Sequence, residues 1–131
     1  MNAIQRSEAI VQKIDERDDI SENRLQNEVC KRLRPLETAL GFVVVHNANG
    51  GKRRPREGRQ LKNRGVRAGF PDLAIYYRGG VALIELKVPN GSVSKEQEAL
   101  FTTLDDLLHP VSVCTSVASV LCVLRQHGLR V

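Results

Sequence analysis

The stretch PDLAIYYRGGVALIELKV, residues 71–88, decides the fold. It contains two apolar runs, residues 72–77 and 81–88, which are joined by the tripeptide RGG. Apolar runs separated by glycines predict a β-hairpin. Both runs are apolar on both faces, so the strands must be covered on both sides by other elements. The sequence therefore predicts an α/β protein with a central mixed sheet between helices.

The elements around this hairpin follow from apolar periodicity, capping residues and breakers. Upstream, we expect a weakly patterned helix at 7–17, a helix from 21 to Pro35, a helical turn at 35–40, a strand at 42–45 and a short helix at 59–65. Downstream, we expect a helix at 94–108, a strand at 111–115 and a helix at 116–127. Residues 1–20 are interpreted as an N-terminal helical arm and residues 21–131 as the main domain.

Length and composition fit one folded domain. The chain has 131 residues, of which 41% are hydrophobic and 27% charged, and its net charge of +5 makes a polyanionic partner plausible. Five aromatic residues are too few for base-stacking platforms. Three cysteines without a C-x-x-C pair exclude a disulfide framework and a zinc ribbon, so we expect a cytoplasmic protein. Polar residues interrupt the longest uncharged run, and we expect no membrane segment.

Positive charge is concentrated just before the hairpin. Residues 52–67 contain eight basic residues and one acid. This segment could grip phosphates, and the preceding glycines would let main-chain amides approach an anion. The alternative is a solvated basic loop that aids solubility. The DNA-binding candidates are Asn49, Gly50, Lys52, Arg53, Arg54, Lys62 and Arg67.

Two acids and a lysine are expected to meet in the hairpin. Glu85 and Lys87 are two residues apart, so they share a face, and a tight turn brings Asp72 alongside them. Two buried carboxylates repel each other, and a divalent cation would compensate. Oxygen ligands favour Mg²⁺, with Mn²⁺ as a substitute, over zinc. Lys87 could then orient water. Alternatively, Glu85 and Lys87 form an edge-strand ion pair and Asp72 caps a turn.

Two helical residues could extend this site. Glu22 falls on the apolar stripe of the helix that begins near 21, so we expect it to point inward as a metal or water ligand, or to favour the helix dipole alone. Gln97 faces inward on the apolar stripe of the next helix, between Leu104 and Leu108, yet the sequence from Ser94 to Gln97 also satisfies a capping box. Both roles are compatible for Gln97.

The residues above resemble a known family. LKNRGVRAGFPDL, IELK and GSVSKEQ, in this order and spacing, are similar to the virus-type replication-repair nuclease (VRR-NUC) domain of the PD-(D/E)XK superfamily, and ENRLQ and NGGKR resemble its stand-alone, phage-type members. The resemblance implies a restriction-endonuclease-like fold and a metal-dependent DNA endonuclease. It implies that Asp72 and Glu85, with Glu22 and Leu86, hold the metal, and that Lys87 and Gln97 complete the catalytic set.

The resemblance also implies a substrate and an assembly. Small stand-alone members are similar to homodimers that cut branched DNA, including four-way (Holliday) junctions. We therefore expect a homodimer in a bacterial or phage-infected cell, with DNA as partner and no small-molecule cofactor. The alternatives are a flap nuclease, a module that binds DNA structure without catalysis, and a structural protein whose basic loop docks on an acidic partner.

Overall fold

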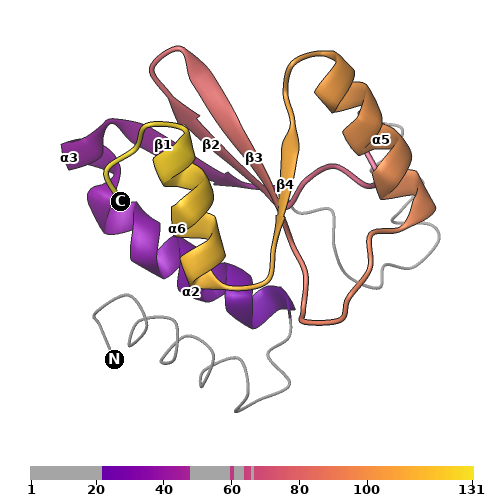
Figure 1. Cartoon of the computed structure of the whole chain (residues 1–131), viewed down its shortest axis with the longest axis horizontal. Coiled ribbons are helices and arrows are strands. Elements are labelled where there is room, and N and C mark those ends of the chain that lie inside the picture. The colour runs from indigo at the N-terminus through magenta and orange to yellow at the C-terminus, as the bar shows by residue number, and fades with distance from the viewer. Residues whose placement is uncertain (1–21, 48–59, 61–63, 66) are drawn as a thin grey trace.

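The computed structural model describes residues 22–47, 60, 64–65 and 67–131 (Figure 1). The elements in chain order are α2 (Glu22–Leu33), the 3₁₀ turn η1 (Arg34–Leu36), α3 (Glu37–Leu40), β1 (Phe42–His46), β2 (Leu73–Tyr77), β3 (Gly80–Leu86), α5 (Lys95–Asp106), β4 (Val111–Cys114) and α6 (Val117–Gln126). These bounds confirm the predicted helices and strands within one to three residues at each end.

Within the described residues, four strands form one mixed sheet in the order β1-β2-β3-β4. The strands β1, β2 and β3 pair antiparallel, with Leu73 opposite Ile84 in the predicted hairpin. The strand β4 pairs parallel to β3, with Glu85 opposite Val113. A parallel neighbour requires a crossover, which the segment containing α5 supplies. The hairpin thus lies in the middle of the sheet, and β1 and β4 form its edges.

Helices lie on both sides of the sheet and cover one face more fully than the other. The helices α2 and α6 pack against one face, whereas α5 lies on the other side of β4 (Figure 1). Side chains from β1, β2 and β3 alternate, so every second residue meets α2 and α6. The resulting core includes Leu25, Val29, Leu33, Phe42, Val44, Leu73, Ile75, Ile84, Leu86, Val120 and Leu124. The predicted coverage of the second face is confirmed only in part, because α5 packs against β4 while Val43, Val45 and Tyr76 on that face are 37–55% exposed.

Local signals explain where the helices begin and end. Gly41 has φ 75°, a left-handed conformation that glycine adopts at little cost, and it ends α3 as predicted. Ser94 begins α5 with the predicted capping box, because its Oγ accepts from the Gln97 amide. The predicted apolar stripe on this helix is wrong at its end. Leu108 is 86% exposed because the helix ends before it and its φ of 65° turns it away.

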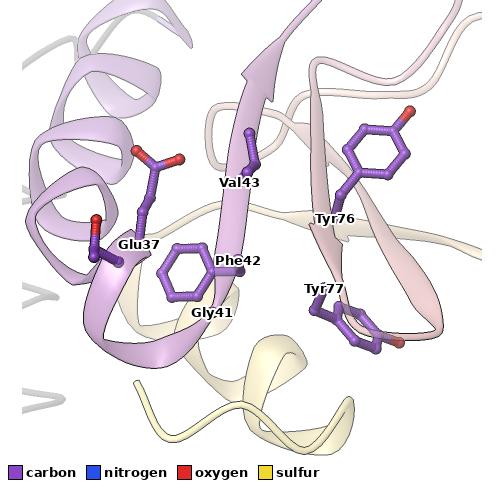
Figure 2. Close-up of a pocket in the computed structure, with 7 residues that line it drawn as sticks. Glu37, Gly41, Phe42, Val43, Tyr76 and Tyr77 are labelled. Atoms are coloured by element: carbon purple, nitrogen blue, oxygen red, sulfur yellow. The ribbon is translucent and has the colours of Figure 1, made fainter.

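The edge strand β1 is protected by an acid from the preceding helix. The Val44 amide donates to Glu37 Oε2 at 2.9 Å, so one outward-facing N–H of this strand already has an acceptor. Figure 2 shows Glu37 beside β1 and next to Phe42 and Val43. Occupied edge donors make it harder for another strand to add to the sheet.

Several predictions fall on residues that the structure does not describe. The helix at 7–17, the arm at 1–20, most of the short helix at 59–65 and most of the basic segment lie outside the described residues. None of the helices in the described part of the chain is long and apolar enough to cross a membrane.

The buried leucine of α2 should contribute strongly to stability. Leu33 has 0% exposure, whereas Leu107 is 62% exposed. We expect Leu33→Ala to lower the free energy of unfolding by about 2–5 kcal/mol, because it removes buried contacts and leaves a cavity. The matched variant Leu107→Ala should change it by less than about 0.5 kcal/mol. Urea unfolding followed by circular dichroism measures both, and equal losses in the two variants would contradict this packing.

Candidate functional site

The hairpin brings Asp72 and Glu85 together at one end of the sheet. Leu73 and Ile84 are opposite each other in the register and point into the core. Asp72 and Glu85 are their immediate neighbours, so both point to the other face and lie side by side. The alternative interpretation is right about the ion pair of Glu85 with Lys87 and wrong about the edge strand, because β3 lies between β2 and β4.

Glu85 is an acid in an apolar environment. Its exposed fraction is 2%, and no other charged residue in the described part of the chain is buried. Burial raises the pKa of Glu85 to about 9, and Asp72 adds to the rise through a hydrogen bond and through its charge. Lys87 opposes the rise with its positive charge. Without a bound cation, the carboxyl groups of Asp72 and Glu85 therefore favour a state in which Glu85 keeps its proton over a state in which both are charged.

Main-chain groups fix Asp72 and Lys87 around this acid. The Leu86 amide donates to Asp72 Oδ2 at 2.8 Å, so the aspartate side chain replaces a main-chain acceptor just before the start of β2. The Lys87 amide donates to the carbonyl of Cys114 on β4 at 3.0 Å. Lys87 Nζ lies 3.9 Å from Glu85 Oε1, and the lysine side chain is 12% exposed. The predicted acid, acid and lysine are thus close in space.

The donor atoms at this site fit a hard divalent cation. Glu85 Oε2 is buried and has no hydrogen-bond partner among the described residues, which is costly unless another group satisfies it. The neighbouring ligands are carboxylate oxygens, which suit Mg²⁺ and Mn²⁺. The side chain of Leu86 has no donor atom, so only its main-chain carbonyl could serve as the predicted ligand. No cluster of three or more His, Cys, Asp or Glu side chains suited to a metal occurs within the described residues.

Glu22 does not point into the core as predicted. It is the first residue of α2 and is exposed, while Leu25 and Val29 on the same stripe are buried. A helical projection gives the direction of a side chain but not its depth, and the first residue lies beyond the covered region. Glu22 is nevertheless close enough for its charge to contribute to the raised pKa of Glu85. Its role as a ligand stays a prediction.

Gln97 lies beside the loop that leads to Asp72. Gly69 has φ 78°, and a Cβ at this position would lie 3.4 Å from the main chain of Gln97. The left-handed φ favours glycine at this position, and the loop lies in van der Waals range of the first turn of α5. Gln97 Oε1 accepts from the Ser94 amide at 3.0 Å, which confirms the capping interaction. Its catalytic role stays a prediction.

Of the predicted DNA-binding residues, the structure describes Arg67, which is exposed. The other six, Asn49, Gly50, Lys52, Arg53, Arg54 and Lys62, lie outside the described residues.

Asn47 was not among the predicted site residues, yet its main-chain amide donates to the Asp72 carbonyl at 2.8 Å. A polar residue directly after an apolar strand was the available signal.

A hollow at the other end of the sheet is separate from the acids. It measures about 560 Å³ and is lined by Glu37, Phe42, Val43, Tyr76 and Tyr77. These residues come from α3, the start of β1 and the end of β2 (Figure 2). Asp72 precedes the first residue of β2, so the length of the strand separates the hollow from the paired carboxylates.

A mixed sheet with paired acids and a lysine at the end of its central hairpin defines an α/β protein of restriction-endonuclease-like fold. The family model of the VRR-NUC domain matches residues 6–118, and the chain therefore belongs to this family. Membership supports a nuclease function, with DNA as the implied substrate.

A solved structure named VRR_NUC domain protein has the same fold. It is 21% identical to this chain with a TM-score of 0.63, and the match covers 83% of this chain and 88% of that one. No curated protein matches the chain in sequence.

Burial of Glu85 predicts a pH dependence of the metal-free protein. The pKa of Glu85 is about 9 in the folded protein, against a usual value of 4.5. Between these values the folded state holds a proton that the unfolded state lacks. This contribution to stability is therefore complete below pH 4.5 and is lost as the pH rises towards 9. The slope is at most about 1.4 kcal/mol per pH unit.

Glu85→Gln should remove this dependence, because glutamine stays neutral. We expect the wild type to lose stability relative to Glu85→Gln from pH 5 to pH 8, measured by urea unfolding in EDTA. Glu28→Gln is the matched control, since Glu28 is exposed on α2. Parallel pH profiles for the wild type and Glu85→Gln would contradict the burial of an acid at this position.

Proposed function

We propose that this protein is a divalent-metal-dependent DNA endonuclease that hydrolyses phosphodiester bonds in branched DNA, such as four-way junctions. The observation that carries the proposal is the paired carboxyl groups of Asp72 and Glu85, with one buried oxygen of Glu85 left unpartnered and the Lys87 amine 3.9 Å away. Membership of the VRR-NUC family supports the nuclease class.

The residues of the site have separable tasks. Asp72, Glu85 and the Leu86 carbonyl would hold Mg²⁺ or Mn²⁺, and Glu22 could add a water-mediated contact. When bound, the ion supplies Lewis-acid stabilisation of charge on the phosphate. Lys87, held through its amide by Cys114, positions the attacking water and stabilises negative charge that develops on the phosphate oxygens. Asp72 keeps its orientation because Leu86 donates to its Oδ2.

The basic segment would provide the grip on DNA. Its charge is concentrated in the residues just before Pro71, which is buried and leads directly into Asp72. Arg67, at the end of this segment, is exposed and therefore accessible to a phosphate. Phosphate contacts fix the position of a duplex but do not read its sequence. Selectivity for branch geometry over base sequence is consistent with such contacts.

Removing one carboxylate should abolish cleavage. We expect Asp72→Asn to lower the rate of cleavage of a synthetic four-way junction in Mg²⁺ by at least about a hundredfold, because it replaces a negatively charged ligand of the metal by a neutral one. Asp105→Asn, in the last turns of α5, is the matched control. Denaturing gels measure both rates, and EDTA should stop the wild type.

Equal cleavage by the wild type and Asp72→Asn would exclude the proposed mechanism. Junction binding without any product, whatever the concentration of Mg²⁺ or Mn²⁺, would instead favour a non-catalytic module that binds DNA structure. Cleavage of a flapped duplex at a higher rate than the junction would favour a flap nuclease.

Cutting two strands of a junction symmetrically requires two sites, and we propose that the active form is a homodimer. Sedimentation equilibrium at micromolar concentration should give twice the chain mass of 14.6 kDa. Addition of junction DNA should then give one dimer on each junction. A mass of one chain, free and on DNA, would contradict this assembly.

A further inference from the structure

Asn47 lies in the same row of the sheet as the two acids. The register of β1 and β2 ends with His46 opposite Leu73, so the next position places Asn47 opposite Asp72. The register of β2 and β3 continues in the same way and places Asp72 opposite Glu85. Opposite residues share a face. Asn47, Asp72 and Glu85 are therefore consecutive across three strands.

Two hydrogen bonds connect Asn47 to the segment that carries Asp72. Its main-chain amide donates to the Asp72 carbonyl at 2.8 Å, and its side-chain Nδ2 donates to the Pro71 carbonyl, also at 2.8 Å. These two carbonyls belong to the peptide units on either side of the Asp72 Cα. Fixing both peptide planes fixes the direction in which the Asp72 side chain leaves the main chain.

The far end of the Asp72 side chain is also held. Its Oδ2 accepts from the Leu86 amide at 2.8 Å, on the strand opposite to Asn47. The carboxylate is therefore held through the main chain from β1 and through its oxygen from β3. These contacts restrict rotation of the Asp72 side chain and keep its carboxyl group next to Glu85.

We propose that Asn47 is a positioning residue, which holds the Pro71–Asp72 segment so that Asp72 faces Glu85 in the geometry that a divalent cation needs. This inference rests on the proposed function of the two acids as a metal site. Groups that orient metal ligands typically affect metal affinity or activity about 10- to 100-fold. The side chain of Asn47 acts through Asp72 and does not itself react.

The test compares Asn47→Ala with His46→Ala. His46 is the neighbouring residue of β1, is exposed and has no part in the site, so it is the matched control. Asn47→Leu is a second variant that keeps most of the side-chain volume but has no donor, and it carries the same measurements if Asn47→Ala fails to fold. In both Asn47 variants the main-chain amide of residue 47 can still donate to the Asp72 carbonyl, so only the side-chain bond to the Pro71 carbonyl is lost.

The first readout needs no activity. Hydrogen exchange by NMR in EDTA should show the Leu86 amide exchanging at least about tenfold faster in the Asn47 variants, because its acceptor on Asp72 is no longer fixed. The Ile84 amide, in the middle of the same strand, is the internal reference. The Mn²⁺ concentration that gives half of the maximal rise in melting temperature should increase about tenfold.

The second readout separates catalysis from binding. With junction DNA, kcat should fall about tenfold or more while KM for DNA stays within about twofold of the wild-type value. The proposal is overturned if the Leu86 exchange rate and the Mn²⁺ midpoint of both Asn47 variants match those of His46→Ala. A wild type that cleaves no DNA would refute the proposed function, whereas the exchange and Mn²⁺ measurements would still decide the role of Asn47.

Discussion

A glutamic acid buried in an apolar sheet is the constraint on which the site depends. Glu85 is only 2% exposed, and its strand neighbours Ile84 and Leu86 belong to the core. Burial alone makes the charged form costly, and the adjacent Asp72 increases that cost. The fold tolerates this arrangement because the sheet fixes both residues through main-chain pairing. A cation between the carboxyl groups would remove the repulsion that the fold otherwise has to balance.

The sheet uses both kinds of strand pairing to assemble the site. The antiparallel hairpin places Asp72 opposite Glu85, and the Leu86 amide then binds the aspartate. The parallel neighbour β4 supplies the Cys114 carbonyl that holds Lys87 just after β3 ends. A hairpin alone would bring the acids together, but it would leave the main chain of the lysine without this partner. The crossover through α5 therefore contributes to the site as well, because it brings β4 and the Cys114 carbonyl beside β3.

The sequence predicts most of this arrangement because its signals are local. The apolar runs, the glycine turn and the capping box at Ser94 define the elements, and the two-residue spacing from Glu85 to Lys87 defines their shared face. The predicted inward direction of Glu22 is wrong, because a helical projection gives the angle of a side chain around the helix but not how deeply that residue is buried. Asn47 was missed because its side-chain acceptor is a main-chain carbonyl 24 residues away, which leaves no spacing pattern.

Alternation along β3 separates the requirements of stability from those of chemistry. Ile84 and Leu86 point towards the face covered by α2 and α6, and both have 0% exposure. Glu85 points to the opposite face, so a change at this residue alters the electrostatics of the site without opening a cavity between the sheet and these helices. Replacing a buried acid by a neutral residue of similar size removes a cost of burial. The same substitution removes a ligand, and stability and activity at this position should therefore change in opposite directions.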